Sequence, residues 1–242
     1  GGTDFTEVNL AATDQASDSP TNNFATLNPL YHYSGNGVFS EGNLVMTTAT
    51  AGHHARGMST IRPANGKWYA ECKVLDATRF AIGFMNGDET NSAQGGNDTN
   101  SVIGSYNRYT HYNGASESEL FASTLSDDDI IMLAMDLDNN LAFLGVNGTW
   151  TRSATEAEIE AGTATNSLTT YVGSTIPVSI GHCGMFIEDN SGSENMSGSF
   201  NFGNPTYANS SSVADENGYG DFEYSVPDGF LALCTKNLGS NG

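Results

Sequence analysis

Short runs in which apolar and polar residues alternate follow one another along most of the chain, and this pattern predicts β-strands. Each run is bounded by Gly, Asn, Asp or Pro, the residues that turns favour. Because no shift in composition marks a linker, the pattern predicts a single all-β sandwich. The predicted strands are Gly42–Thr48, Gly66–Leu75, Phe80–Met85, Ser101–Tyr106, Ile130–Asp136, Leu141–Val146, Ile176–His182, Ser197–Phe202 and Phe230–Thr235.

The clearest local signal is a hairpin, in which Ile130–Asp136 and Leu141–Val146 pair across a turn at Asp138–Asn140. Asp and Asn tolerate the positive φ angles that tight turns require. A helix is predicted at Ser153–Gly162, which offers a Ser/Thr cap, acidic residues in the first turn and a terminal Gly. We therefore expect one short helical insertion near residues 154–161. Gly83 lies inside a predicted strand, where close packing or a bulge explains a glycine.

Charge and composition exclude two classes of partner. The chain has 242 residues, with 28 acidic and 8 basic side chains and a formal net charge of −20. Nucleic acids and anionic lipids attract clustered Lys and Arg, so we expect no nucleic-acid partner. No apolar run approaches the ~18 residues of a membrane span, so we expect no membrane insertion either.

The cysteines give little information about function. Cys72, Cys183 and Cys234 lie in apolar stretches without the spacing of a metal site. We expect three buried thiols that act as small hydrophobic residues. One disulfide plus one free thiol is the alternative.

Eight segments along the chain carry a family resemblance through their order: Asp18–Leu30, Gly42–Leu44, Gly66–Glu71, Phe80–Phe84, Asp129–Asp138, Pro177–Gly181, Ser199–Gly203 and Pro227–Leu238. Together they resemble the SPRY domain family, in the variants found in bacteriophage tail-fibre-like and other virion proteins. The resemblance implies a concanavalin A-like sandwich of two antiparallel sheets, as a single all-β domain over residues 1–242. It further implies an opening segment over 1–40 that packs on the sandwich and a closing strand over 221–238. Leu144-Gly145 and the long segment 151–170 depart from the family pattern, which leaves the ligand open.

The resemblance also implies a non-enzymatic structural or adhesion module of a virion or other extracellular assembly, in the manner of a capsid decoration or tail fibre. Its partner would be a protein subunit of a virion or cell-surface assembly, or a host glycan, within a larger oligomer. We expect no catalytic residues, because Glu71 and Glu223 are isolated and no strand carries the paired carboxylates of a glycanase. The alternatives are a secreted carbohydrate-active enzyme or lectin of the same sandwich class, and a self-assembling surface-filament subunit.

Two groups of residues are candidate sites. The first combines the aromatic, amide and charged side chains that grip sugars or peptides, although two of its three tyrosines could equally be packing residues: Tyr106, Asn107, Arg108, Tyr109, His111, Tyr112 and Asn113. The second offers carboxylate oxygens suited to Ca²⁺: Asp88, Asp98, Asp136 and Asp138. For Asp136 and Asp138 the alternative role is to anchor the hairpin turn. No cofactor other than possible Ca²⁺ is expected.

Overall fold

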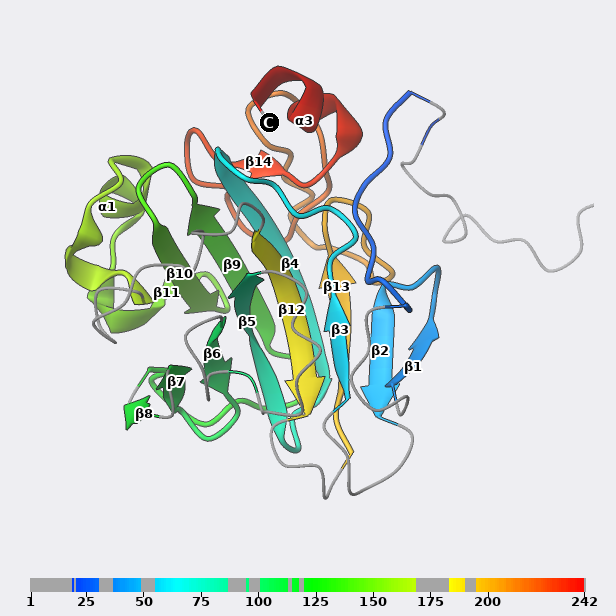
Figure 1. Cartoon of the computed structure of the whole chain (residues 1–242), viewed down its shortest axis with the longest axis vertical. Helices are drawn as coiled ribbons and strands as arrows, with labels where there is room; N and C mark the ends of the chain where they lie inside the picture. The colour runs from blue at the N-terminus through cyan, green and yellow to red at the C-terminus, as the bar shows by residue number, and fades with distance from the viewer. Residues whose placement is uncertain are drawn as a thin grey trace, which may run out of the picture.

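The structure is a computed structural model that describes residues 19, 21–30, 37–48, 55–86, 95, 101–112, 115–117, 120–168, 183–189 and 195–241. Within these residues the strands form two sheets that pack face to face, which confirms the predicted β-sandwich (Figure 1). Short helical segments decorate the sandwich: the 3₁₀ turns η2 (Thr151–Ser153) and η3 (Ala164–Asn166), and the α-helices α1 (Glu156–Glu160) and α3 (Thr235–Asn241). None of the helices in this part of the chain is both long and apolar enough to cross a membrane.

The larger sheet contains eight strands among the described residues. These are β1 (Gly37–Ser40), β2 (Val45–Thr48), β4 (Lys67–Asp76), β9 (Ile130–Asp136), β10 (Leu141–Val146), β11 (Thr149–Trp150), β13 (Ser197–Asn201) and β14 (Leu231–Ala232). Their order is β1-β2-β13-β4-β9-β10-β11, and β14 joins this sheet by pairing in parallel with β4.

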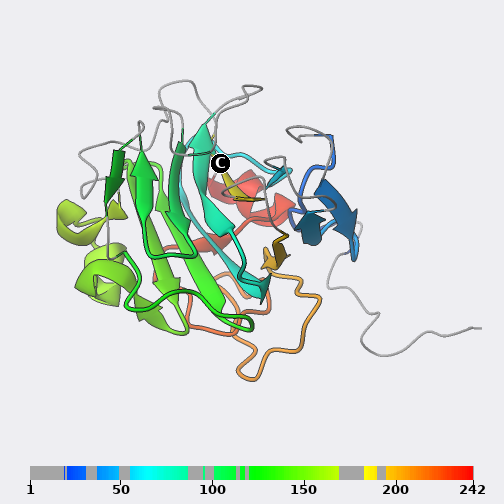
Figure 2. The same ribbon diagram turned by 90° about the horizontal axis from the view of Figure 1, so that it is seen from below.

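The smaller sheet contains six strands in the described part of the chain, in the order β3-β12-β5-β6-β7-β8. These are β3 (Arg56–Met58), β5 (Phe80–Asn86), β6 (Ser101–Ser105), β7 (Thr110–Tyr112), β8 (Ala115–Glu117) and β12 (Cys183–Asp189). Its strand pairings are antiparallel. Two views at right angles place α1 and η2 at one side of the molecule and β1 at the other (Figures 1 and 2).

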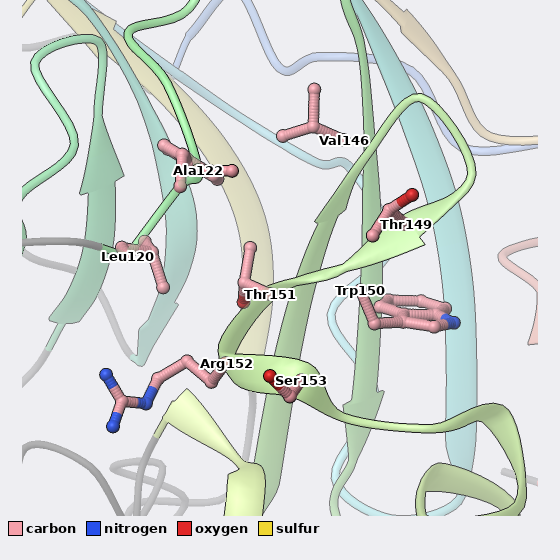
Figure 3. Close-up of a pocket in the computed structure, with 9 residues that line it drawn as sticks. Leu120, Ala122, Val146, Thr149, Trp150, Thr151, Arg152 and Ser153 are labelled. Atoms are coloured by element: carbon pink, nitrogen blue, oxygen red, sulfur yellow. The ribbon is translucent and has the colours of Figure 1, made fainter.

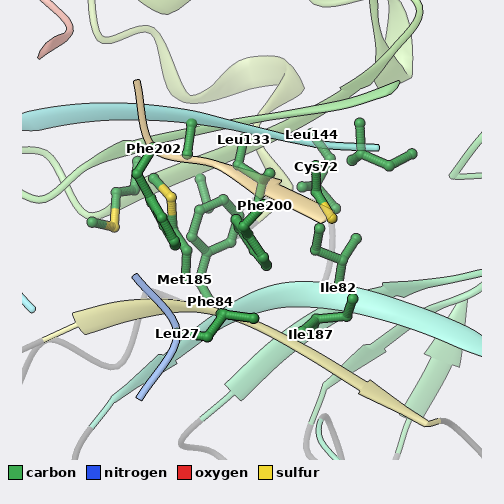
Figure 4. Close-up of a cluster of buried hydrophobic side chains, with 14 of the residues drawn as sticks. Leu27, Cys72, Ile82, Phe84, Leu133, Leu144, Met185, Ile187, Phe200 and Phe202 are labelled. Carbon is green, nitrogen blue, oxygen red and sulfur yellow. The ribbon is translucent and has the colours of Figure 1, made fainter. Parts of the chain in front are cut away.

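The main core fills the space between the two sheets (Figure 4). Phe200 and Phe202 of the larger-sheet side stack with ring centroids 4.7 Å apart and planes at 6°. Ile82 and Phe84 on β5 and Met185 on β12 face them from the smaller sheet. Burying aliphatic and aromatic side chains of this size stabilises a fold by about 1.5–3 kcal/mol each, so this layer fixes the two sheets relative to each other.

A second core lies on the outer face of the larger sheet. Trp68 belongs to the layer between the sheets, whereas its neighbour Tyr69 points to the opposite face because side chains alternate along a strand. On that face Tyr69 meets Phe222 edge-on, with ring centroids 5.1 Å apart. Phe230 and Cys234 pack into the same cluster. The segment after β13 therefore covers this face as a strap, which we define as residues 203–238.

The opening segment of the described chain meets the end of this strap. Phe24 forms an antiparallel bridge with Cys234. The Asn23 amide donates to the Thr235 hydroxyl at 3.0 Å, and the Thr235 amide donates to the Asn23 carbonyl at 3.0 Å. Residues 23 and 24 of the opening segment thus contact the end of the strap, while the boundaries of an opening segment over 1–40 and a closing strand over 221–238 stay a prediction.

Several predicted elements are confirmed: the hairpin strands at their predicted bounds, and the helix within the predicted segment but shorter. The hairpin strands are Ile130–Asp136 and Leu141–Val146, and Asn140 adopts a positive φ of 57° in the turn. Helix α1 begins after Thr155, whose side chain and Glu158 form a reciprocal capping box. All three cysteines are buried and free, which confirms the thiol prediction and excludes the disulfide. Burial raises the pKa of Cys183 to about 12, so this thiol stays protonated.

Other predictions need correction or stay open. The predicted strand Ile176–His182 lies outside the described residues, while β12 occupies the next segment, Cys183–Asp189. All seven β12 residues are buried, including Glu188 and Asp189, whose charged side chains gave no strand signal in the sequence. The predicted strand Phe230–Thr235 is reduced to the two residues of β14, because Thr235 already begins α3.

Candidate functional site

A pocket of about 360 Å³ opens beside β11, the last strand of the larger sheet (Figure 3). This volume is within the range of pockets that hold small molecules or the side chains of a partner. The lining combines apolar, hydroxyl and cationic groups: Leu120, Phe121, Ala122, Val146, Thr149, Trp150, Thr151, Arg152 and Ser153.

One wall of the pocket is built by the chain reversal after β10. Asn147 and Gly148 adopt positive φ angles of 49° and 81°, which return the chain as β11 and pair Trp150 with Gly145. A Cβ on Gly145 would lie 2.2 Å from the Met132 side chain and 3.0 Å from the Thr149 carbonyl oxygen. Glycine at this position therefore allows β11 to approach β10 closely.

The turn that follows β11 is held in an uncommon backbone conformation. Arg152 and Ser153 have positive φ angles of 59° and 58°, although neither is glycine. Consecutive residues in this region cost free energy, and such conformations cluster at binding and active sites. In Figure 3 the Arg152 side chain extends toward the Leu120 side of the pocket, while the Trp150 ring lies on the other side of Thr151. Trp150 also packs edge-on against Tyr69, with ring centroids 6.5 Å apart, so its ring is supported from behind.

The opposite wall is the segment around Leu120 and Phe121, and the turn after β6 holds it in place. The Arg108 side chain donates through Nε to the Phe121 carbonyl at 2.8 Å. The Leu120 amide donates in return to the Arg108 carbonyl at 2.9 Å. The Leu125 amide donates to the Tyr106 carbonyl at 2.9 Å. Part of the predicted ligand-binding group thus supports the pocket wall from behind.

The structure places the predicted ligand-binding residues in several roles. Tyr106 is half-buried against the main core, and its hydroxyl accepts a hydrogen bond from the Arg79 guanidinium. Asn107 accepts a hydrogen bond from the Ser105 hydroxyl at 2.7 Å. Tyr109 is 38% exposed, so among the described side chains of this group its ring is open to solvent. The side chains of His111 and Tyr112 and the whole of Asn113 lie outside the described residues. A sugar- or peptide-binding role for the group stays a prediction.

The predicted calcium ligands are only partly described. Asp136 is fully buried and accepts hydrogen bonds from the Asn139 amide at 3.0 Å and the Asn139 side chain at 2.8 Å. Its carboxylate also lies 3.6 Å from the Lys67 ammonium. Asp138 accepts a hydrogen bond from the Gly66 amide at 2.9 Å. Both side chains therefore anchor the hairpin turn, the alternative raised from the sequence.

Asp88 and Asp98 lie outside the described residues. Within the described part of the chain, no group of three or more His, Cys, Asp or Glu side chains could hold a metal ion. Calcium binding stays a prediction.

Glu71 and Glu223, the two isolated carboxylates considered above as catalytic candidates, have structural roles in the strap. Glu71 is buried in β4 and accepts hydrogen bonds from the Tyr69 hydroxyl and from the Glu223 and Tyr224 amides, each at 2.9 Å. Burial raises the pKa of Glu71, although these hydrogen bonds act in the opposite direction. Glu223 bonds the Ser210 hydroxyl and amide, which lower the pKa of the Glu223 carboxyl. Both groups tie backbone segments together.

Sequence reasoning missed the residues of the pocket. Trp150 is one of two tryptophans and Arg152 one of eight basic residues in the chain. They lie two positions apart directly after the Asn147-Gly148 turn, and this juxtaposition was the available signal. The contribution of Leu120 and Phe121 could not be predicted, because it depends on long-range hydrogen bonds to the turn after β6.

Comparison with known proteins gives matches to solved structures alone: no protein-family model and no curated protein matches the sequence. The structure is similar to the SPRY domain of human HERC1, with a TM-score of 0.54 and 13% sequence identity, over 72% of this chain and 96% of that domain. Stonustoxin matches with a TM-score of 0.49 and 13% identity, over 73% of this chain and 27% of the toxin chain. The chain therefore has a SPRY-like fold, a sandwich of two largely antiparallel sheets with short helices.

Proposed function

We propose that the chain is a non-enzymatic binding module that holds a segment of a protein partner in the pocket beside β11. The observation that carries this proposal is the pocket itself, whose lining combines apolar side chains with one guanidinium and three hydroxyl groups at the edge of a sheet. Such a combination of apolar and polar groups is typical of binding sites. The SPRY-like fold adds support, because domains of this fold commonly bind proteins.

Selection of peptides from a random display library on the immobilised full chain tests this function. We expect the selected peptides to bind the wild-type chain and to lose at least about 10-fold in affinity on Thr151→Arg, which fills the pocket, a loss of about 1.4 kcal/mol. Thr21→Arg is the matched control, because this substitution introduces the same side chain at an exposed position of the opening segment beside α3. Peptides whose binding is equally insensitive to both substitutions would contradict the proposal.

The more specific role that we propose is display on a virion or other extracellular assembly. It is supported by the net charge of −20 and by a composition in which charged residues make up only 15% of the chain. Such a surface is kept soluble by charge repulsion while polar uncharged side chains remain available for contacts. Electron microscopy of native particles labelled with an antibody against the chain would test this role, and particles without label would contradict it. Light scattering on the purified chain would separate a discrete module from a filament subunit.

A further inference from the structure

We infer that Asn65 is a site of spontaneous covalent modification, at which the Gly66 nitrogen displaces the side-chain amide and Asp138 accepts the proton that this nitrogen loses. The product is aspartate or isoaspartate at position 65. The reaction consumes water and no other reagent, and it does not depend on the binding function proposed for the pocket beside β11.

The sequence requirement for this reaction is an asparagine followed by a glycine. Three such pairs lie wholly within the described residues: Asn65-Gly66, Asn147-Gly148 and Asn217-Gly218. Because glycine has no Cβ, its backbone nitrogen can approach the preceding side chain with little steric hindrance. What distinguishes the three pairs is how the fold holds each asparagine side chain.

Hydrogen bonds hold the side chains of two of these asparagines in place. The Asn147 carbonyl oxygen accepts the Ile130 amide at 2.9 Å, and its side-chain amide donates to Asp129 at 2.7 Å. The Asn217 side-chain amide donates to the Asn237 side chain at 2.9 Å. These bonds must break before the side-chain carbon can turn toward the next backbone nitrogen, which costs free energy. Both pairs are therefore protected.

Asn65 lies exposed in the bend before β4 and lacks this protection. Among the residues that the structure describes, none forms a hydrogen bond with its side-chain amide. The backbone is held instead, because the Asn65 carbonyl accepts the Trp68 indole N–H at 2.7 Å and the Gly66 carbonyl accepts the Leu137 amide at 3.0 Å. The side chain is thus free to rotate, while the nitrogen that attacks it stays in a fixed place.

A proton acceptor is already in position beside that nitrogen. The Gly66 amide donates to Oδ1 of Asp138 at 2.9 Å, a distance at which a carboxylate can act as a general base. As the Gly66 nitrogen bonds to the side-chain carbonyl carbon of Asn65, its proton passes to Asp138 and then to the departing nitrogen, which leaves as ammonia. Water opens the resulting succinimide ring at either carbonyl.

The modification changes two features of the structure. Asn65 lines a polar cavity of about 230 Å³ together with the carboxylates of Asp138 and Glu216, so the product adds a third negative charge there. In isoaspartate the main chain runs through the side-chain carbon, and the former backbone carbonyl becomes a free carboxylate. The Trp68 indole, which donates to that carbonyl, therefore reports the reaction.

Peptide mapping of the folded full chain after incubation in H₂¹⁸O, with digestion in ordinary water, tests the inference. Trypsin releases residues 57–67 as a peptide in which the one asparagine is Asn65. We expect ¹⁸O to enter position 65 at least about 10-fold faster than positions 147 and 217, because the free side chain and the general base both favour attack. In the urea-unfolded chain these contacts are lost, so the three positions should react at similar rates.

Two variants separate the base from the charge of the cavity. Asp138→Asn keeps an oxygen that can accept the Gly66 amide but removes the basic carboxylate, so ¹⁸O entry at position 65 should slow about 10-fold. Glu216→Gln is the matched control, because it removes the same charge from the same cavity at a side chain that accepts no hydrogen bond from Gly66. Its rate should equal that of the wild type.

The two tryptophan indole signals in a ¹⁵N NMR spectrum give a second readout. We expect the Trp68 signal to shift as the product accumulates, and the Trp150 signal to stay in place and show that the chain remains folded. Asn65→Gln should block ¹⁸O entry at position 65, since the longer side chain closes the ring poorly.

Rates at position 65 no higher than those at 147 and 217 in the folded chain would overturn the inference, as would an unmoved Trp68 signal in a chain that has taken up ¹⁸O at position 65 as isoaspartate. Equal rates in the wild type and Asp138→Asn would overturn the assignment of Asp138 as the base.

Discussion

Among the glycines in the described part of the chain, Gly83 in β5 leaves the least room between a side chain and neighbouring backbone. A Cβ there would lie 2.1 Å from the Val102 carbonyl oxygen and 2.8 Å from the Ile103 Cα on the adjacent β6. Both atoms belong to backbone that is fixed in the sheet by pairing between β5 and β6. The contact confirms that close packing accounts for this glycine, as its position inside a strand indicated.

Gly83→Ala should therefore destabilise the fold by about 1–3 kcal/mol or more, because one strand has to move. Gly239→Ala is the control, since a Cβ at Gly239 meets nothing within 4 Å and α3 favours alanine. Denaturant unfolding measures both. Equal stability of the two variants would contradict the clash.

We expect Glu71 and Glu223 to make the stability of the fold depend on pH in opposite directions. Burial raises the pKa of Glu71, so the folded state binds this proton more tightly than the unfolded chain does. The contribution of Glu71 to the free energy of unfolding is then fully present below the pKa that this carboxyl has in the unfolded chain. The contribution is lost as the pH rises through the pKa of Glu71 in the folded state. Hydrogen bonds from Ser210 lower the pKa of Glu223, so its contribution is present above the unfolded pKa and is lost as the pH falls through the folded one.

Glu71→Gln should cost about 1–3 kcal/mol at neutral pH, because one carboxylate oxygen is replaced by a donor that faces the strap amides. The stability gap between the wild type and Glu71→Gln should widen as the pH falls toward the ordinary carboxyl pKa. The difference in stability between the wild type and Glu223→Gln should narrow as the pH falls further. Urea unfolding across this range measures both gaps, and slopes of the same sign would contradict the assignments.

At the level of elements, the strap over the outer face of the larger sheet depends on Asp215. One oxygen of Asp215 accepts the Asn217 and Tyr219 amides at 3.0 and 2.8 Å. The other accepts the Ala232 amide at 2.9 Å and the Asn237 side chain at 2.7 Å. This single carboxylate therefore joins the loop after β13 to β14 and α3.

Asp215→Asn should loosen the strap, because the new amide group cannot accept two of these four hydrogen bonds. We expect a loss of about 1–3 kcal/mol and faster amide exchange around β14 and α3, with the hairpin of β9 and β10 unaffected. Asp228→Asn, at an exposed position of the same strap, makes the same chemical change and should have little effect. Uniform exchange throughout the Asp215→Asn chain would contradict a local role.

The elements also separate what local sequence determines from what it does not. The β9–β10 hairpin was predictable because the apolar runs and the Asn139-Asn140 turn are local. A strand was also predicted around β14, but its parallel pairing with β4 was not predictable, because this pairing joins residues far apart in the chain. The pocket shares this difficulty: Trp150 and Arg152 are local to one turn, but the facing wall is contributed by Leu120 across the sheet edge.

For the whole molecule, the net charge of −20 means that the folded chain repels itself. Raising NaCl from low to moderate concentration should screen this repulsion and increase the melting temperature by a few degrees, about 2–4 °C per kcal/mol for a domain of this size. A double variant, Asp228→Asn with Glu216→Gln, removes two exposed negative charges and should respond less to salt. A melting temperature that falls with added salt would contradict a dominant role for repulsion.

The meeting of Phe24 with Cys234, and of Asn23 with Thr235, also determines how force would reach the molecule. Force applied through a tether before residue 23 and another after residue 235 would act at this one point. The force would therefore not be transmitted across the sandwich. A pull would load the short pairing of residues 23–24 with 234–235 before it loaded any sheet. The pocket beside β11 lies on the far side from β1 and the opening segment (Figure 1). Its geometry would therefore be mechanically shielded while the anchor point bears the tension.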